Sequence, residues 1–455
     1  MAVAVQEPVA LIDGFAGEVL QPDDAAYDGA RSVHNGLVDK RPALIARCRG
    51  TADVVAAVNA ARENGWEVSI RGGGHNVAGT AVTDGGLMID LSLLKGIHVD
   101  PAARTVHAQG GVLWKELNRE TQLHGLAVTG GAISTTGIAG LTLGGGLGWL
   151  MTKLGLAADN LLSVELVTAD GRVLTVSADE HPDLFWGLRG GGGNFGVATS
   201  FEYRLHPVGP MITGGLIAHP IDAAGDLLRF MRGFAEGIPD DLMFVAGCVH
   251  APDGSGVPLA AVGVCHSGSL EDAEKDLAPL LEFGSPALSM IGPMPYEAVC
   301  QMLDDAYPKG ALNYWKSTFL SELSDDAIDS MISQFESCPS PMTAMIVEHF
   351  HGEVTRVPVD ATAVPHRQPG YNLVITGIWM DPSTTEANVA WTRDTYDAMA
   401  PFAESRRWLN YLPAEEADDT ALHATFGPNY ERLVELKSTY DPTNLFRLNA
   451  NIKPR

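Results

Sequence analysis

The chain has 455 residues, of which 45% are hydrophobic and 19% are charged, a composition typical of a globular protein with a large buried core. Its formal net charge of −26 at pH 7 repels phosphate backbones and anionic lipids, so we expect no nucleic acid and no membrane among its partners. No apolar run reaches the roughly 18 residues of a membrane-spanning helix.

Neither a leader peptide nor a disulfide scaffold is expected. Residues 1–20 contain three acidic residues and no basic start, unlike a signal peptide, which makes a cytoplasmic location the expectation. The five cysteines are scattered, odd in number and without a CxxC pair, so a disulfide framework or a structural zinc site is not favoured. We expect buried, unreactive thiols.

Short helices and short strands are mixed over the first 205 residues, a pattern typical of an α+β fold. The apolar spacing of residues 51–64 predicts a helix that is capped by Thr51 and ended by Gly65. Residues 161–169 and 173–176 predict a hairpin, because a turn at Asp170 and Gly171 separates them. The other expected elements are strands at 68–71, 86–90, 105–108 and 197–205 and helices at 113–124 and 182–188.

A second domain is expected after the Pro- and Gly-rich residues 207–211, which are typical of a linker. Beyond them, helical and strand patterns alternate, which indicates a sheet with helices against one face. The clearest of these patterns are helices at 222–236 and 270–281 and strands at 259–264 and 373–380. An amphipathic helix at 430–440 ends before Asp441 and Pro442.

Three glycine clusters occur in the first 200 residues, at 71–76 (RGGGHN), 140–149 (GLTLGGGLGW) and 189–196 (RGGGGNFG). The third contains the letters GxGxxG, but a helix pattern precedes it and a strand pattern follows it, the reverse of a Rossmann motif. Consecutive glycines can instead direct backbone N–H groups at an anion. A single cluster would indicate only a tight turn, whereas three favour an extended ligand with a pyrophosphate.

His75 lies near the end of the first cluster, where it is either a turn histidine, a satisfied core group or a functional residue. Its nearest carboxylates, Asp84 and Asp90, do not complete a metal site. His349 and His351 alternate on a strand and could be ligands, but a half-buried polar face is the commoner case. We therefore expect no metal. A GxSxG elbow is absent from the sequence, so hydrolase chemistry has no support.

Several long stretches, taken in order, resemble the PCMH-type FAD-binding domain. They are residues 41–76, 84–92, 140–174 and 181–199. With the ending 440–452, the whole chain is similar to the berberine-bridge-enzyme-like oxidases. The resemblance implies an α+β fold with a two-part PCMH-type FAD-binding domain, and a substrate domain with an antiparallel sheet backed by helices. The implied boundaries are 1–208 for the FAD-binding domain, 209–400 for the substrate domain and 401–455 for a C-terminal segment that returns to the FAD.

The resemblance implies FAD that is covalently bound through His75, because the family joins this histidine to the flavin 8α-methyl carbon. Many members also attach a cysteine, at a position that Ile133 occupies here, so a single attachment is implied. The remaining residues implied to bind FAD are Arg71, Gly72, Gly73, Gly74, Asn76, Thr135, Thr136, Gly137, Gly140, Gly144, Gly145, Gly146, Val197, Asn410 and Asn449.

The family's catalytic signature near the C-terminus is roughly Y-x-N-Y, and this chain has Trp408, Leu409, Asn410 and Tyr411 there. The resemblance implies Tyr411 as the catalytic base, although a tyrosine has an ordinary pKa near 10 that the site must lower. The alternative is that Tyr411 only lines the pocket. Glu348 is the second candidate base.

The position of Glu348 depends on the strand at 345–350. Strand alternation places Glu348 and Phe350 on one face and His349 and His351 on the other, but does not show which face meets the flavin.

The implied function is an oxidase that transfers hydride from an alcohol or amine carbon of a small organic substrate to the flavin, with molecular oxygen as the reoxidant and hydrogen peroxide as product. Thr136 is small at a family position where leucine is associated with oxygen exclusion, which favours an oxidase. The alternatives are a flavin dehydrogenase, an oxidative cyclase, or a non-catalytic flavin-binding protein. His75 and Asn410 with Tyr411 argue against the last. We expect a monomer or a homodimer.

Overall fold

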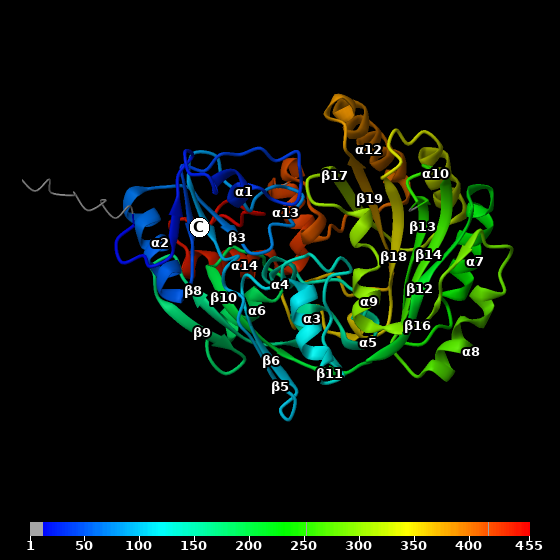
Figure 1. The fold of residues 1–455 in the computed structure, drawn as a ribbon, viewed down its shortest axis with the longest axis horizontal. Coiled ribbons are helices and arrows are strands. Elements are labelled where there is room, and N and C mark those ends of the chain that lie inside the picture. The colour runs from blue at the N-terminus through cyan, green and yellow to red at the C-terminus, as the bar shows by residue number, and fades with distance from the viewer. Residues whose placement is uncertain (1–11, 252, 417) are drawn as a thin grey trace, which may run out of the picture.

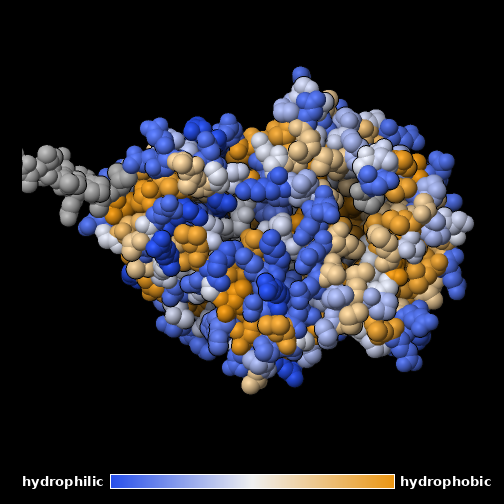
Figure 2. Space-filling model, in the orientation of Figure 1, coloured by the Kyte–Doolittle hydropathy of each residue, from blue (hydrophilic) through white to orange (hydrophobic). Residues whose placement is uncertain are grey.

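The computed structural model describes residues 12–455 except residues 252 and 417. The chain forms two halves that lie side by side (Figure 1). One half combines the N-terminal elements with the C-terminal helices, and the other is built on one large sheet. Among the described residues, none of the helices has both the length and the apolar character needed to cross a bilayer. On the face drawn in Figure 2, hydrophilic residues are spread over both halves, with smaller hydrophobic areas between them.

The first sheet has four strands in the order β1 (Glu18–Leu20), β2 (Leu44–Arg47), β4 (Leu87–Asp90) and β3 (Val68–Arg71). Its last three strands are parallel, and α2 (Thr51–Asn64) is the crossover between β2 and β3. The expected stop at Gly65 is confirmed, since this residue adopts φ 67°. The expected cap is wrong: Gly50 precedes the helix, and the Thr51 hydroxyl donates to Glu165 at 2.6 Å.

The second sheet has five antiparallel strands, and apolar side chains from its strands and helices form the core of this half. The expected hairpin is confirmed, because Val167 pairs with Val173 across the turn. The strand order is β5 (Ile97–Asp100), β6 (Thr105–Gln109), β10 (Val197–Arg204), β8 (Leu161–Val167) and β9 (Val173–Ser177). The helices of this half are α1 (Tyr27–Arg31), α3 (Trp114–Gln122), α4 (Ile138–Leu143), α5 (Met151–Leu154) and α6 (Pro182–Leu188).

The other half is built on an eight-stranded sheet, whose antiparallel pairing confirms the expected antiparallel sheet. Its order is β15 (Leu288–Ser289), β12 (Met211–Pro220), β14 (Pro258–His266), β13 (Leu242–His250), β18 (Ala344–Phe350), β19 (Gly370–Trp379) and β17 (Leu312–Leu320), with β16 (Gly292–Pro295) also on β12. The helices that cover its outer face are α7 (Ala224–Phe234), α8 (Leu270–Leu281), α10 (Asp325–Glu336) and α12 (Thr385–Met399) (Figure 1). Two shorter helices, α9 (Tyr296–Gln301) and α11 (Glu353–Arg356), contact α3 and α5 of the first half, respectively.

The connection between the halves is shorter than the expected linker. Strand β11 (His206–Pro207) pairs with β7 (Leu126–Ala127), and β12 already begins at Met211. Both ends of the expected linker, Pro207 and Met211, are therefore strand, because their backbones pair with strands of different halves.

The C-terminal segment contains α13 (Asp419–Phe426) and α14 (Tyr430–Tyr440) and packs onto the first half (Figure 1). Lys437, which is fully buried, donates to Asp441 at 2.7 Å and to the backbone oxygens of Asn194 and Phe446, both at 2.9 Å. The Asn194 side chain in turn accepts from the Ile452 N–H at 3.0 Å. These bonds fix the C-terminal segment against the third glycine cluster.

Candidate active site

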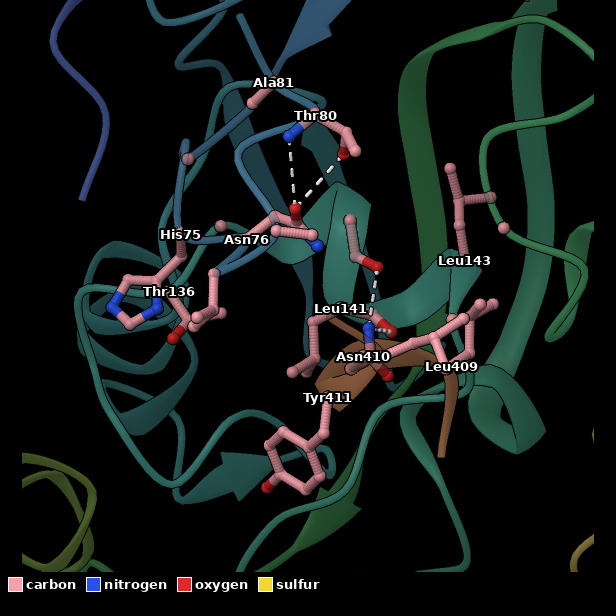
Figure 3. Close-up of a pocket in the computed structure, with 18 of the residues that line it drawn as sticks. His75, Asn76, Thr80, Ala81, Thr136, Leu141, Leu143, Leu409, Asn410 and Tyr411 are labelled. Carbon is pink, nitrogen blue, oxygen red and sulfur yellow. Dashed lines mark hydrogen bonds between the residues drawn. The ribbon is translucent and has the colours of Figure 1, made fainter. Parts of the chain in front are cut away.

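A cavity of about 480 Å³ lies between the two halves. Glycine-rich segments of the first half form its floor, the inner face of the large sheet forms its roof, and the C-terminal segment closes one side. Figure 3 shows His75 and Thr136 on one wall, with Asn410 and Tyr411 reaching the space from the C-terminal segment.

The floor depends on close approach between backbones. A Cβ atom on Gly73 would lie 2.4 Å from the backbone nitrogen of Gly137, so neither segment could carry a larger residue there. A Cβ on Gly144 would lie 2.3 Å from the amide nitrogen of Asn410. Asn410 itself donates to the Gly140 carbonyl at 3.2 Å and accepts from the Trp408 indole at 3.1 Å. Figure 3 shows Asn410 beside this glycine-rich segment. The cavity wall is therefore backbone-rich, which suits a ligand with a pyrophosphate.

His75 follows β3 and borders the cavity. Its Nε2 lies 3.2 Å from the hydroxyl of Thr135, and its ring stacks on that of the buried His34 at a centroid distance of 3.8 Å. Burial, together with the neighbouring His34, lowers the pKa of His75 to about 3. The imidazole is therefore neutral at pH 7, which leaves one ring nitrogen with a free lone pair for bond formation.

The loop beside His75 is held by the other half of the protein. Ser134 donates through its backbone N–H and its hydroxyl to the two carboxylate oxygens of Asp304, at 2.8 and 2.6 Å. Ile133 in the same loop lines the cavity and packs with Tyr307 and Trp315. The wall that carries Thr135 is thus fixed by contacts from both halves.

The roof presents six side chains from four neighbouring strands. Strand pairing sets Glu348 opposite Val245 and sets Ile346 opposite Val374. Only Glu348 and Thr376 are polar within this set, which consists of Val245, Trp315, Ile346, Glu348, Val374 and Thr376. Alternation sends His349 to the opposite face, where its ring stacks on Phe244 under the helices. The strand ends at Phe350, before His351, whose ring stacks on that of His349, and neither histidine lines the cavity.

Glu348 is 7% exposed, and two donors hold it. The hydroxyl of Tyr411 donates to its Oε1 at 2.9 Å, and the amide of Asn372 donates to its Oε2 at 2.7 Å. Burial raises the pKa of Glu348 to about 7, which the two hydrogen bonds counteract in part. Burial and the adjacent Glu348 charge raise the pKa of Tyr411 well above its usual 10. Near neutral pH, the carboxylate is therefore the group of this pair that can accept a proton.

Comparison with known proteins shows a family for the whole chain. A model described as an FAD binding domain matches residues 42–177, and one described as berberine and berberine like matches residues 408–453. The (R)-6-hydroxynicotine oxidase of Paenarthrobacter nicotinovorans is 32% identical over 458 residues, which cover 96% of this chain and 97% of the relative. An FAD-linked oxidoreductase of Dictyostelium discoideum is 31% identical and covers 91% of this chain, with 89% of its own length aligned. The chain belongs to the berberine-like family of FAD-linked oxidoreductases.

Solved structures agree with this assignment. The crystal structure of 6-hydroxy-D-nicotine oxidase from Arthrobacter nicotinovorans matches with a TM-score of 0.89 at 31% identity, covering 99% of this chain and 100% of that one. A chitooligosaccharide oxidase matches with a TM-score of 0.84 at 22% identity, a likeness of fold alone. The expected family, the α+β fold, FAD as cofactor and the enzyme class are therefore confirmed for this berberine-like oxidoreductase.

Most of the residues that the sequence implied for the berberine-like site border the cavity. These residues are Gly72, Gly73, Gly74, His75, Asn76, Thr136, Gly137, Gly140, Gly144, Glu348, Asn410, Tyr411 and Asn449. The remaining ones lie behind its wall, and they are Arg71, Thr135, Gly145, Gly146 and Val197. Their implied roles in cofactor binding stay predictions.

Each residue behind the wall has a place in the fold. Arg71 is not among the residues that line the cavity, and its guanidinium donates to the backbone oxygen of Ala30. The Thr135 hydroxyl contacts His75 Nε2, and Val197 is buried in the core of the first half. Gly145 and Gly146 pack beside Trp408 and Ala157, respectively. These contacts give Arg71 and Val197 structural roles that the motif letters alone do not reveal.

Sequence reasoning missed several residues of the site. Asn372 lies beside Glu348 on the neighbouring strand, and Asp304 holds Ser134 over 170 positions of sequence separation. Trp315 and Tyr307 line the cavity near Ile133. A strand pattern at residues 312–320 could have suggested Trp315, but no local signal marks the others.

Proposed function

We propose that this chain is an FAD-dependent oxidase of a small alcohol or amine, in which Glu348 takes the proton from the substrate O–H or N–H. The observation that carries the proposal is the Glu348–Tyr411 hydrogen bond of 2.9 Å on the cavity roof. Bound FAD would supply the redox chemistry, by accepting hydride from the substrate carbon and passing the electrons to oxygen to give hydrogen peroxide.

Glu348 suits the role of base better than Tyr411. A general base works best when its pKa lies near the working pH, and the pKa of Glu348 is raised by burial to about 7. Tyr411 would have to ionise next to the Glu348 carboxylate, which like-charge repulsion disfavours. In this arrangement Tyr411 orients the carboxylate through its hydroxyl. Its role as base, expected from the family signature, stays a prediction with less support.

The roof favours a substrate with an apolar body and one polar reacting group. Val245, Trp315, Ile346 and Val374 offer no hydrogen-bond partners along most of their surface. A sugar would leave several hydroxyls unpaired there, and an unpaired buried hydroxyl costs about 1–3 kcal/mol. The geometry thus supports aromatic or aliphatic alcohols and amines more than oligosaccharides.

Reduction of the flavin by substrate tests the proposed activity. Under anaerobic conditions, apolar alcohols and amines should bleach the yellow colour, and admission of air should restore it with one hydrogen peroxide per oxidised molecule. Reduction without peroxide formation would favour the dehydrogenase or cyclase alternatives. Failure of a broad panel to reduce the flavin would favour a non-catalytic flavin protein.

Attachment of FAD at a single residue, His75, is part of the proposal. His75 borders the cavity as a neutral imidazole, and Ile133 stands where other members carry a cysteine. None of the cavity-lining residues that the structure describes is a cysteine. Peptide mapping should therefore find the FAD mass on the His75 peptide and on no cysteine peptide. FAD mass on any of the five cysteine peptides would contradict a single attachment.

The remaining expectations concern the surroundings of the enzyme. Molecular oxygen and a small molecule are the partners that the proposed reaction requires. A cytoplasmic location, a monomeric or homodimeric state and the domain boundaries stay predictions.

A further inference from the structure

Asn372 occupies a distinctive position behind the proposed base. It lies on β19 directly across from Glu348 on β18, and its side chain is fully buried. Its amide nitrogen donates to Oε2 of Glu348 at 2.7 Å, while the hydroxyl of Tyr411 donates to Oε1 at 2.9 Å. The two oxygens of one carboxylate are thus held by donors from two different parts of the chain.

Few other polar groups surround this carboxylate. Tyr411 faces it from the C-terminal segment, and Tyr307 faces it from the residues before β17. Across the sheet, β13 presents the apolar Val245. Within the part of the chain that the structure describes, Glu348 takes part in no ion pair. The charged form of Glu348 therefore depends on its two hydrogen-bond donors.

We propose that Asn372 is a positioning residue for Glu348: its amide holds Oε2, keeps Oε1 directed toward Tyr411 and the cavity, and stabilises the carboxylate against its protonated form. This inference rests on the proposed function, because it assigns Asn372 a role through the base named there. Removing the amide takes away one of the two hydrogen bonds that oppose the effect of burial, so Glu348 should hold its proton to a higher pH.

The choice of an amide fits this role. An amide donates a hydrogen bond without carrying a charge, so it cannot neutralise the base as a lysine or arginine would. Its own Oδ1 has no hydrogen-bond partner and is buried. A leucine would avoid that unpaired atom at similar size, so a purely structural role would not favour asparagine here.

Infrared difference spectroscopy of the flavin-loaded protein tests the proposal without substrate. The protonated-carboxyl band that disappears in Glu348→Gln identifies Glu348, and its intensity is followed against pH. The band should titrate near pH 7 in the wild type, where burial places the pKa of Glu348. In Asn372→Leu the midpoint should move upward by about one pH unit, because a donor to the charged form is lost.

Asn388→Leu is the matched control. Asn388 is also a buried asparagine with an unpaired Oδ1, but it lies on α12, where its amide donates to Thr384. The Asn388→Leu variant should leave the titration midpoint of Glu348 unchanged. Asn372→Asp keeps the shape of the side chain and provides a second test should the leucine variant not fold. A second carboxyl beside Glu348 should also raise the midpoint, through like-charge repulsion.

The outcomes separate this inference from the proposed function. An unchanged midpoint in both Asn372 variants, or an equal shift in the Asn388 control, would overturn the role of Asn372. If the midpoint shifts as expected and the acidic limb of anaerobic flavin reduction shifts with it, both proposals stand. If the infrared midpoint shifts but reduction keeps its pH profile, Asn372 still positions Glu348, and Glu348 is not the base.

Discussion

Replacement of Glu348 by glutamine should slow anaerobic flavin reduction by about 10²–10⁴-fold, the usual contribution of a general base. Glutamine keeps the size of the side chain and can still contact Tyr411, but it cannot accept the substrate proton. Because this interaction matters in the transition state, kcat and kcat/KM should fall together. Stopped-flow absorbance of the flavin measures the reduction directly.

The pH dependence of flavin reduction should also be set by Glu348. Wild-type reduction should slow as the pH falls through about 7, because protonation of Glu348 removes the acceptor. Glu348→Gln should lose this acidic limb. Tyr411→Phe should retain it and lose less activity, since only an orienting hydroxyl disappears. His349→Gln, on the opposite face of the same strand, is the matched control and should reduce at the wild-type rate. A strong loss in Tyr411→Phe with a near-normal Glu348→Gln would assign the base to Tyr411 instead.

The second large effect concerns the cofactor link. After acid precipitation, wild-type protein should remain yellow, whereas His75→Ala should release its flavin completely into the supernatant. The variant should still bind FAD before acid treatment, because the backbone-rich floor and the C-terminal segment do not depend on the imidazole. Absorbance of pellet and supernatant gives the bound fraction.

The exposed His124 provides a control for loss of a histidine, and His124→Ala should keep its flavin through precipitation. A colourless wild-type pellet would exclude the covalent link. It would leave the oxidase proposal to be tested separately, because FAD held without a covalent bond can carry the same chemistry.

Much of the local structure follows from the sequence because the signals are local. The periodicity at 51–64 and Gly65 define a helix and its end, and the turn at Asp170 and Gly171 defines a hairpin. The prediction of Thr51 as the helix cap was wrong because the Thr51 hydroxyl donates a hydrogen bond to Glu165, a tertiary contact. Propensity cannot reveal such competition from a strand 114 positions away.

The site was only partly predictable, since strand alternation gives two faces but does not say which one meets the cavity. In β18 both faces are buried: Phe350 packs toward the first half, and His349 stacks under the helices. The hydrophobicity of the sequence therefore does not show which face of β18 meets the cavity. The choice of Glu348 required the register between β18 and β19, which also brings in Asn372. Long-range register of this kind depends on the packing of the entire sheet.

The attachment of the C-terminal segment has a consequence for how the enzyme folds during its synthesis on the ribosome. Asn449 donates to the carbonyl of Gly193 across 256 positions, and the buried Lys437 joins Asn194 across 243. The ribosome therefore synthesises His75 and the glycine-rich floor long before it synthesises the C-terminal residues that close the cavity. Contacts of such long sequence separation form late and slowly. FAD binding is therefore expected late in folding. A nascent chain whose N-terminal sheet has already folded still lacks the C-terminal residues that complete the binding site.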